Sequence, residues 1–296
     1  MIVNLNEVLG KAQKGGYAVG LFNTTDTDML QAAIEAAEEM HSPIIIGTAE
    51  VLLPYGEFEL IAPSIVHMAE QASVPVVVHY DHGLTFDRCM QALRLGFSSI
   101  MFDGSLSSPQ QNIAETREIV KIAHSFGASV EGEIGHVGNA DESGQADHAD
   151  AVNESGCADR EESAEEDPYT TPKEAYEYVA ATGVDALAVA VGTAHGVYIK
   201  KPKLDFDRLR SIRETVDTPL VLHGGSGLSD DDFRQAVKNG IAKINIYTDL
   251  CMAGRKAMEE GISLGENYNQ IRNRKVAAIR EVVKNKMILF GSVDKA

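Results

Sequence analysis

The stretch VVVHYDHGLT, residues 76–85, places three consecutive valines before His79, Asp81 and His82. A short run of β-branched residues predicts a buried strand, because such side chains pack well on a pleated sheet. Ionisable groups are costly to bury unless they are paired or bind a ligand. The stretch therefore predicts a buried strand whose carboxyl end carries chemistry.

Similar apolar runs recur along the whole chain. The expected strands cover residues 17–22, 43–48, 74–80, 98–103, 128–134, 185–192, 219–224 and 241–247. Amphipathic stretches lie between most of them, and several end at a glycine, as helices often do. This alternation predicts an α/β fold, a TIM (β/α)8 barrel, with the chain 1–296 as a single domain. An open doubly wound sheet is the alternative, but the first strand is not followed by a G-x-G-x-x-G turn.

Two segments depart from this rhythm. Residues 266–296 continue past the last expected strand with periodic apolar positions, which predict an extra C-terminal helix. Residues 139–167 contain eleven acidic residues and one arginine, which account for more than half of the formal charge of −18. Because this segment has few large apolar side chains, it predicts a long, mobile acidic loop after the fifth strand.

Composition excludes several classes of function. The negative charge argues against binding to nucleic acid or to anionic membranes. No apolar run is long enough to span a membrane, and the first residues lack the core of a signal peptide. The three cysteines form no C-x-x-C pair, so we expect neither a disulfide framework nor a cysteine zinc site, and we expect a cytoplasmic location.

Polar residues gather at the carboxyl ends of the expected strands, where TIM barrels carry their active sites. His82, His195 and His223 follow three different strands. One histidine at such a position is more often a hydrogen-bonded core residue, but three at equivalent positions favour a zinc site with an open coordination position. His79 lies deeper in its strand, and we interpret it as structural. We place the others on the surface or in packing contacts, or assign them no role: His41, His67, His124, His136 and His148.

Glycine-rich turns follow the last strands. HGGSG, residues 223–227, and INIYTDL, residues 244–250, each precede a stretch of helical character. Loops at these positions of TIM barrels commonly hold phosphate through backbone N–H groups at helix N-termini. The pattern favours a phosphate site, and an ordinary glycine-rich turn without a ligand is the alternative.

Six motifs in order resemble one enzyme family. HYDHG, MFDGS, GEIGHVGN, GTAHGVY, LHGGSG and KINIYTDL are similar to motifs of the class II, zinc-dependent ketose-bisphosphate aldolases, which include the fructose- and tagatose-bisphosphate enzymes. The resemblance covers nearly the whole chain. It implies a lyase that reversibly cleaves a phosphorylated ketose to dihydroxyacetone phosphate and an aldehyde. It also implies Zn²⁺, a monovalent cation (Na⁺ or K⁺) beside the phosphate, and a homodimer or homotetramer.

The resemblance assigns roles to particular residues. It implies that His82, His195 and His223 bind the catalytic Zn²⁺ and that Asp81 moves the proton of the substrate's C4 oxygen. A second metal position would involve Asp103 and Glu133, and a loop acid, Asp141 or Glu142, would exchange the C3 proton. Residues of the last loops would hold the phosphorylated ketone: Gly196, Gly224, Gly225, Ser226, Asn245, Ile246, Thr248 and Asp249.

The sequence departs from the family pattern at the aldehyde end of the substrate. Asp26, in FNTTD, stands where relatives usually carry an asparagine, and a carboxylate there would repel a phosphate. For the arginine that holds the distal phosphate in bisphosphate enzymes, the only candidates are Arg272 and Arg274. With the acidic segment, these departures favour a ketose 1-phosphate, or another extended sugar, whose aldehyde half need not be phosphorylated.

Three other functions are considered. The first is a standard fructose- or tagatose-1,6-bisphosphate aldolase that tolerates these changes. The second, a zinc hydrolase on a barrel, is disfavoured because the first strand lacks the H-x-H pattern of such enzymes. The third is a non-catalytic, metal-dependent barrel that binds a sugar phosphate, which would take up metal without turnover.

Overall fold

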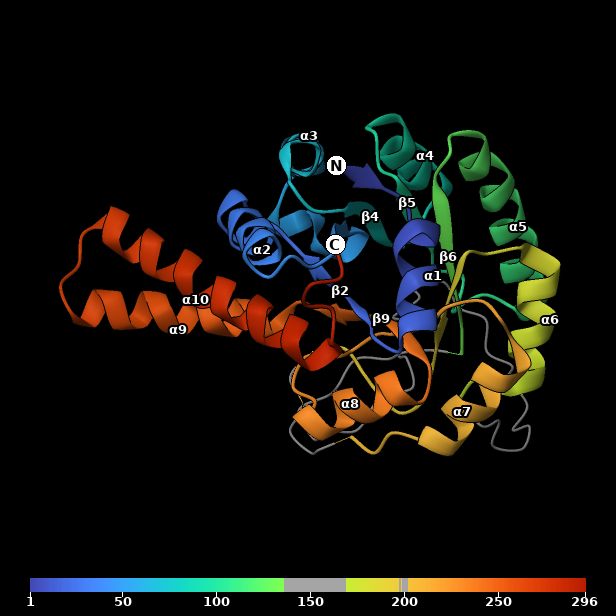
Figure 1. Cartoon of the computed structure of the whole chain (residues 1–296). Coiled ribbons are helices and arrows are strands. Elements are labelled where there is room, and N and C mark those ends of the chain that lie inside the picture. Colours follow the sequence, from blue (N-terminus) through green and yellow to red (C-terminus); the bar gives the residue numbers. More distant parts are fainter. Residues whose placement is uncertain (136–168, 197, 199–201) are drawn as a thin grey trace, which may run out of the picture.

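Parallel strands form a closed barrel (Figure 1). The computed structural model describes residues 1–135, 169–196, 198 and 202–296. Within them the barrel strands are β2 (Val19–Asn23), β3 (Ile44–Ala49), β4 (Val76–Gly83), β5 (Ser99–Phe102), β6 (Ser129–Ile134), β7 (Ala186–Val189), β8 (Leu220–Leu222) and β9 (Ile241–Ile246). Pairing between β4 and β5 closes the circle, and the two-residue strand β1 (Ile2–Val3) adds to β4. The predicted TIM barrel is confirmed.

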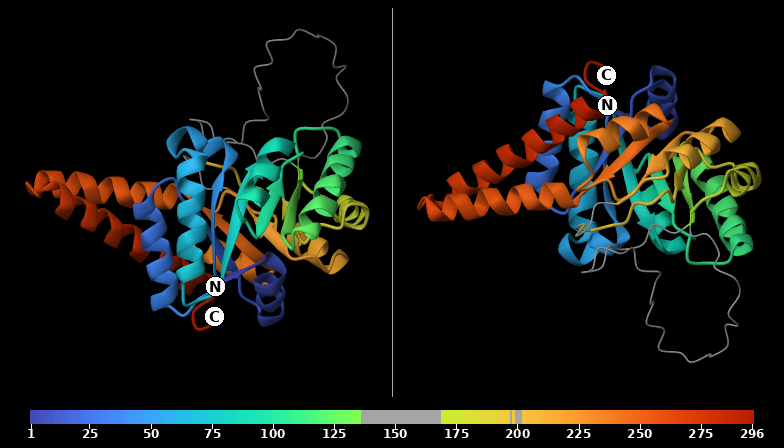
Figure 2. Two further views of the ribbon diagram at one scale, coloured as in Figure 1. Left: turned by 90° about the horizontal axis from the view of Figure 1, so that it is seen from above. Right: turned by 90° about the horizontal axis from the view of Figure 1, so that it is seen from below.

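Helices alternate with the strands, and most of them cover the outside of the barrel (Figures 1 and 2). They are α1 (Leu5–Gly15), α2 (Thr27–Glu39), η1 (Glu50–Tyr55), α3 (Phe58–Gln71), α4 (Phe86–Arg94), α5 (Pro109–Ser125), α6 (Pro172–Thr182), α7 (Phe206–Thr215), α8 (Asp230–Lys238), α9 (Thr248–Ser263) and α10 (Tyr268–Phe290). The predicted acidic loop, with Asp141 and Glu142, lies outside the described residues. In the described part of the chain, no helix combines the length and apolar character needed to cross a membrane.

Local sequence signals fix the helix ends. Thr171 accepts a hydrogen bond from the backbone N–H of Glu174, whose side chain reaches back to Thr171, so α6 begins with a capping box. The same helix ends at Gly183, whose φ of 72° is left-handed and favours glycine. The same two signals mark the ends of α1 and α10.

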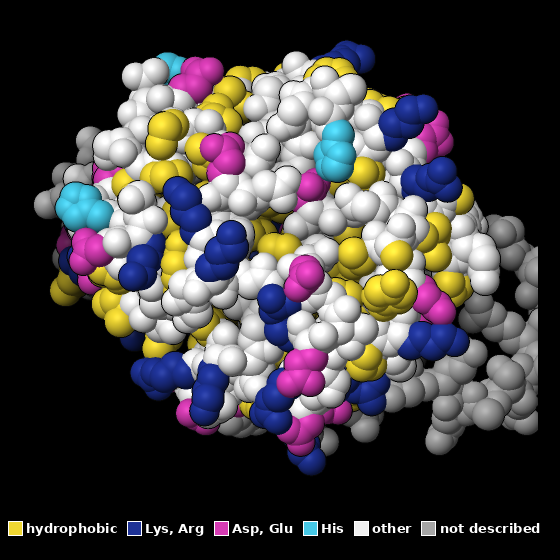
Figure 3. Space-filling view, turned by 45° about the vertical axis from the view of Figure 1, so that its right-hand side comes forward, with side chains coloured by type: hydrophobic (Ala, Val, Ile, Leu, Met, Phe, Trp, Pro, Cys, Tyr) yellow, Lys and Arg dark blue, Asp and Glu magenta, His cyan; other side chains and the backbone are white. Residues whose placement is uncertain are grey.

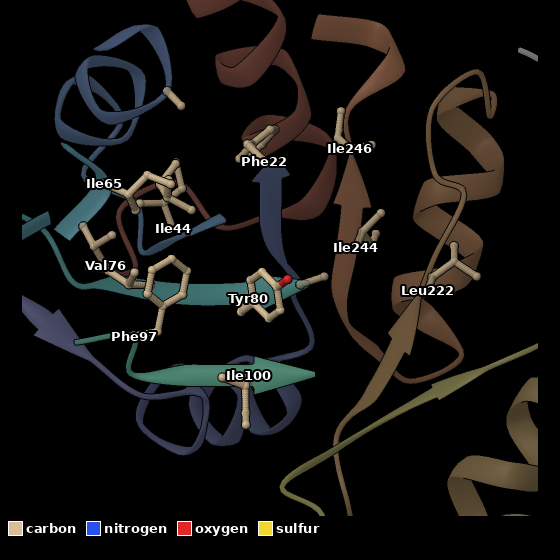
Figure 4. Close-up of a cluster of buried hydrophobic side chains, with 14 of the residues drawn as sticks. Phe22, Ile44, Ile65, Val76, Tyr80, Phe97, Ile100, Leu222, Ile244 and Ile246 are labelled. Carbon is tan, nitrogen blue, oxygen red and sulfur yellow. The ribbon is translucent and has the colours of Figure 1, made fainter. Parts of the chain in front are cut away.

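Two apolar clusters stabilise the barrel. The larger cluster lies between the strands and the outer helices, where Phe22, Ile44, Val76 and Tyr80 are fully buried (Figure 4). The smaller cluster lies inside the barrel, where side chains of α1 pack against inward residues of the strands. Helix α1 therefore closes the amino-terminal end of the barrel. The members of this smaller, inner cluster are Leu5, Val8, Leu9, Ala12, Tyr17, Val19, Leu21, Ile45, Val77, Ala186, Ala188, Val221 and Ala242.

The interior changes character toward the carboxyl ends of the strands. Along β4, Val77 belongs to the inner apolar cluster, whereas the next residues of the same parity are His79 and Asp81. Both are buried, at 0% and 1% exposure. The barrel is therefore apolar at the end covered by α1 and ionisable at the other end.

The C-terminal helices form a hairpin that projects from the barrel (Figures 1 and 2). The predicted extra helix is α10, whose Val276, Ile279, Val283 and Met287 are buried. Between α10 and α2, oppositely charged side chains pair across the contact, for example Lys275 with Asp26 at 2.8 Å. Beyond this contact the hairpin leaves apolar side chains exposed: Met252, Met258, Ile262, Leu264 and Tyr268.

The face shown in Figure 3 carries charges of both signs. Lysine and arginine side chains there are interspersed with aspartate and glutamate, and single apolar side chains lie between them. Such a mixture creates no broad patch of one sign on this face.

Candidate metal centre and active site

Three histidines meet at the carboxyl end of the barrel. His82 is the penultimate residue of β4, His195 follows β7 and His223 follows β8, and one ring nitrogen of each lies within 4.8 Å of the others. The ring centroid of His82 lies 4.5 Å from that of His223 and 4.9 Å from that of His195. The structure thus brings the predicted histidines together, and their role as metal ligands remains a prediction.

Carboxylates orient two of these rings. Nδ1 of His82 lies 2.8 Å from Asp103 Oδ2, and Nε2 of His223 lies 2.8 Å from Glu131 Oε1. The remaining nitrogens, His82 Nε2 and His223 Nδ1, face each other at 2.8 Å. A histidine that binds a metal commonly uses its second nitrogen in this way, which fixes the ring and its tautomer.

The three rings differ in protonation. Burial, together with the neighbouring His82 and His223, lowers the pKa of His195 to about 3. Burial also lowers the pKa of His223. For His82, burial alone would lower the pKa, but the charges of Asp81 and Glu133 and the hydrogen bond to Asp103 raise it to about 10. These neighbours favour the protonated form of the His82 ring, whose Nε2 lies 2.8 Å from Nδ1 of His223.

A β-bulge explains how adjacent residues reach the same site. Neighbours in a regular strand point to opposite faces. In β4, Tyr80 pairs with Ile100 and Gly83 pairs with Phe102, so β4 contains one extra residue at this point. His82, within the bulge, has a φ of 44°, in the left-handed region that few non-glycine residues adopt. Because of this distortion, both Asp81 and His82 line the same cavity.

Asp81 is a buried carboxylate held by two amides. Its Oδ2 accepts hydrogen bonds from Asn23 Nδ2 at 2.8 Å and from Asn245 Nδ2 at 3.1 Å. Burial alone would raise the pKa of Asp81, but the positive charges of His82 and Lys243 and a contact with His79 hold it well below its ordinary value. Asp81 is therefore ionised and fixed in orientation beside the histidine cluster.

Asp103 and Glu133, the predicted second metal position, lie at the same centre. Asp103 accepts hydrogen bonds from His82 and from the backbone and hydroxyl of Ser105. Glu133 is buried, and its Oε2 lies 3.6 Å from Nδ1 of His223. One donor atom each from His82, Asp103 and Glu133 lies within 4.8 Å of the others, so the group could hold a cation.

One cavity of about 470 Å³ joins these groups to the last loops of the barrel. Most of the predicted site residues line it, and His223 lies buried beneath it. The lining residues are Asn23, Ala49, Val51, Leu52, Asp81, His82, Leu84, Asp103, Leu106, His195, Gly196, Gly224, Gly225, Ser226, Asn245, Ile246, Tyr247 and Thr248.

The loops after β7, β8 and β9 lie close together. Gly224 has a φ of 64°, and a Cβ there would collide with the carbonyl oxygen of Ala194, so this approach requires glycine. The hydroxyl of Tyr198 donates to the carbonyl of Gly224 and accepts from Ala194 N–H, which joins the segments that carry His223 and His195. Ser226 Oγ accepts from the N–H of Asp249 at the start of α9.

Several predicted residues do not line the cavity. Both oxygens of Asp26 are engaged, since Oδ1 caps α2 and Oδ2 pairs with Lys275. Arg272 pairs with Asp28 at 2.8 Å, and Arg274 pairs with Glu266. The carboxylate of Asp249 accepts from Gly227 N–H and pairs with Lys286. These positions lend no support to the expected contacts of Asp26, Arg272, Arg274 or Asp249 with substrate.

Comparisons with known proteins agree with this architecture. A model of the family described as fructose-bisphosphate aldolase class-II matches residues 3–295. The chain belongs to the class II fructose-bisphosphate aldolase family. It is therefore an enzyme of the lyase class.

Relatives cover the chain from end to end. The fructose-bisphosphate aldolase of Thermus caldophilus is 38% identical over 325 residues, which span 100% of both chains. The uncharacterized protein YdjI of Escherichia coli (strain K12) is 39% identical over 280 residues, 95% of this chain and 94% of YdjI. The crystal structure of the YdjI aldolase from Escherichia coli K12 has a TM-score of 0.85 at 34% identity and covers 100% of both chains. The fructose-bisphosphate aldolase of Campylobacter jejuni shares the fold, with a TM-score of 0.76 at 19% identity over 100% of this chain and 97% of its own.

Sequence reasoning missed four side chains of this aldolase site. Asn23 holds Asp81, Tyr198 joins two strand ends, and Glu131 and Lys243 lie buried below the histidines. A lysine in the apolar strand IAKINI and the paired acids in EGE were visible signals, because charged residues are almost never fully buried unless they are paired. Their pairing across the barrel is set by its closure, which the sequence does not show.

Proposed function

We propose that this aldolase reversibly cleaves a phosphorylated ketose to dihydroxyacetone phosphate and an aldehyde, and that the reaction depends on zinc. One observation carries the proposal. Three converging histidines, two of them oriented by carboxylates, share a cavity edge with the buried and ionised Asp81.

The donor set fits zinc. Three imidazoles are a common ligand set for catalytic zinc, which keeps a further position for substrate. Facing nitrogens of His82 and His223 at 2.8 Å, with their other nitrogens on carboxylates, match a pair of ligands that share an ion. A bound zinc ion supplies Lewis acidity that stabilises negative charge beside the ketose carbonyl. We further propose that Asp103 and Glu133 provide a second metal position with His82.

Asp81 would move the proton. During cleavage its ionised carboxylate takes the proton of the C4 hydroxyl, and in condensation it returns that proton to the new hydroxyl. Asn23 and Asn245 fix the carboxylate through hydrogen bonds of 2.8 and 3.1 Å, so Asp81 meets the substrate in one orientation. Orientation of this kind lowers the entropic part of the barrier.

The phosphate of the ketone half would lie beside the loops after β7, β8 and β9. Gly196, Gly225, Ser226 and Thr248 line the cavity there, and α9 begins at Thr248. Small residues and a helix N-terminus allow backbone N–H groups to approach an anion. We also propose a monovalent cation, Na⁺ or K⁺, beside this phosphate.

The opposite side of the cavity favours an aldehyde half without phosphate. The loops after β3, β4 and β5 supply Val51, Leu52, Leu84 and Leu106 to its lining, together with Ala49. Among the described lining residues none is lysine or arginine. A phosphate on this side would lose its hydration without gaining a cationic partner among the lining residues that the structure describes. We therefore propose that the substrate is a ketose 1-phosphate. The reason is the apolar lining of this side of the cavity, and not the charge of Asp26.

A panel of aldehydes tests both parts of the proposal. Zinc-loaded enzyme is incubated with dihydroxyacetone phosphate and either glyceraldehyde or glyceraldehyde 3-phosphate, and the condensation products are quantified. We expect faster condensation with glyceraldehyde. Faster reaction with the phosphorylated aldehyde would favour the first alternative, a fructose- or tagatose-1,6-bisphosphate aldolase such as the name of the Thermus caldophilus relative describes. Zinc uptake without either product would favour a non-catalytic sugar-phosphate-binding barrel.

Location and assembly complete the proposal. We propose a cytoplasmic enzyme, because Cys89 and Cys251 are free thiols and reducing compartments keep thiols free. We propose a homodimer or homotetramer, because the projecting α9–α10 hairpin exposes apolar side chains, including Ile262 and Leu264. Light scattering of the purified protein measures the oligomeric state, and a monomer would contradict this part.

A further inference from the structure

A fully buried ion pair lies below the histidine cluster. Lys243 on β9 and Glu131 on β6 are both 0% exposed, and the Lys243 Nζ lies 2.7 Å from Glu131 Oε2. Burying two charges costs several kcal/mol per ion before their attraction is counted. Well-packed apolar side chains of similar volume are often as stable, so stability alone gives little reason for this pair.

The pair is connected to both functional groups above it. The second oxygen of Glu131, Oε1, lies 2.8 Å from Nε2 of His223. On the other side, the Lys243 Nζ lies 3.9 Å from Oδ1 of Asp81. His79 lies between the two acids, with Nε2 3.6 Å from Asp81 and 3.8 Å from Glu131, while its Nδ1 bonds to Ser99. Glu131 is thus held by Lys243 at one oxygen and meets His223 with the other.

We propose that Lys243 and Glu131 are positioning residues that fix His223 in the tautomer with Nδ1 directed to the metal. The inference rests on the proposed role of the three histidines as the zinc site. A carboxylate only accepts hydrogen bonds, so Nε2 of His223 must carry the hydrogen and Nδ1 presents its lone pair. The ion pair of Lys243 with one carboxylate oxygen favours the orientation in which the other oxygen meets the ring.

The geometry around His223 agrees with this tautomer. With Nε2–H directed to Glu131, Nδ1 of His223 faces Nε2 of His82 at 2.8 Å, inside the cluster of proposed ligands. His223 therefore already presents a lone pair at the position where a metal would be bound.

Three variants separate positioning from a structural role. Glu131→Gln keeps the size of the side chain but offers an amide that can donate to Nε2 and reverse the tautomer. Lys243→Met removes the ammonium. Because either single change leaves a buried group without its partner and can impair folding, the double variant Glu131→Met, Lys243→Met removes both charges together. The matched control is Ser129→Ala, on the same strand as Glu131, which removes a buried hydrogen bond to Leu5 away from the histidines.

Zinc affinity and the tautomer are the readouts. Zinc dissociation constants are measured by competition with a chromophoric chelator, and ¹⁵N-histidine spectra report the tautomer of His223 in the metal-free protein. We expect Glu131→Gln and the folded double variant to bind zinc about 10- to 100-fold more weakly and to lose the pure Nε2–H tautomer of His223. Ser129→Ala should keep wild-type zinc affinity even if its stability falls.

The outcomes distinguish two failures. If wild-type protein binds no zinc, or if replacing His82 leaves zinc binding unchanged, the proposed metal site itself is wrong. If wild-type protein binds zinc and the folded double variant binds it equally well with the same tautomer, the metal site stands and the positioning role of Lys243 and Glu131 is refuted.

Discussion

Gly83→Ala tests whether the β4 bulge places the functional groups. A Cβ at Gly83 would lie 2.6 Å from the Cys89 sulfur and 2.7 Å from the carbonyl oxygen of Met101. The sulfur belongs to a side chain, but the oxygen belongs to the neighbouring strand β5. Relief to an ordinary contact of 3.4 Å requires a displacement of roughly 0.7 Å, which the bulge must absorb because β5 is held on both sides by strand pairing.

This displacement falls on Asp81 and His82. Because a misplacement of about 1 Å can cost about 100-fold in rate, we expect kcat/KM for ketose-phosphate cleavage to fall about 10- to 100-fold. Overpacking should also lower the free energy of unfolding by about 1–3 kcal/mol. A coupled assay for dihydroxyacetone phosphate measures the first quantity, and urea unfolding measures the second.

A second substitution separates the two contacts. Cys89→Ala removes the sulfur but leaves the Met101 oxygen in place, so the double variant Gly83→Ala, Cys89→Ala should recover part of the stability and little of the rate. Wild-type rate and zinc affinity in folded Gly83→Ala would refute the reasoning. Full recovery of rate in the double variant would show that the sulfur, and not the strand, sets the geometry.

Other predictions address the proton, the metal and the hairpin. Asp81→Ala should retain zinc and lose about 10²- to 10⁴-fold in cleavage rate, and near-normal turnover would remove Asp81 from the reaction. His82, with a pKa of about 10, must lose a proton to bind zinc, so zinc added at pH 8 should release close to one proton, and zinc affinity should rise with pH toward 10. An indicator dye in weak buffer measures the proton release. If zinc binds without releasing a proton, His82 is not the protonated ligand. Lys275→Met should lower the unfolding free energy by about 1 kcal/mol or less, with a smaller effect in high salt, and leave cleavage unchanged, because neither Lys275 nor its partner Asp26 lines the cavity; an equal loss in the exposed control Arg234→Met would count against a specific α2–α10 pair.

The fold was predictable because strand positions depend on local pattern. Each predicted strand overlaps an observed one, with ends that differ by a few residues at most, since buried branched runs are bounded by polar turns. The two-residue β1 was missed, because Ile2–Val3 is too short to show any period. The acidic segment 139–167 stays a prediction, as does the assignment of the whole chain to one domain.

The site was predictable in part, for geometric reasons. His82, His195 and His223 follow strands, and the carboxyl ends of parallel barrel strands must meet. Asp26 comes three residues after Asn23, where the chain has already turned into α2, so its predicted contact with substrate stays a prediction. An aspartate just before a helical stretch is a common N-cap, so the sequence itself already indicates this role for Asp26. The contact of Lys243 with Glu131 depends on which strands face each other across the barrel, a long-range property that no local pattern encodes.

The change from apolar to ionisable side chains along the barrel strands separates the residues that stabilise the fold from those that carry the chemistry. On β4, Val77 contributes to the closed apolar end and Asp81, four residues later, to the open ionisable end. Random changes near Val77 and α1 should threaten folding, whereas changes in the final residues of each strand and in the loops beyond them should alter chemistry on an intact scaffold. A library of variants designed to accept new aldehydes should therefore change only residues on the cavity side of Glu131 and Lys243. Such changes leave the apolar end of the barrel, which α1 covers, intact.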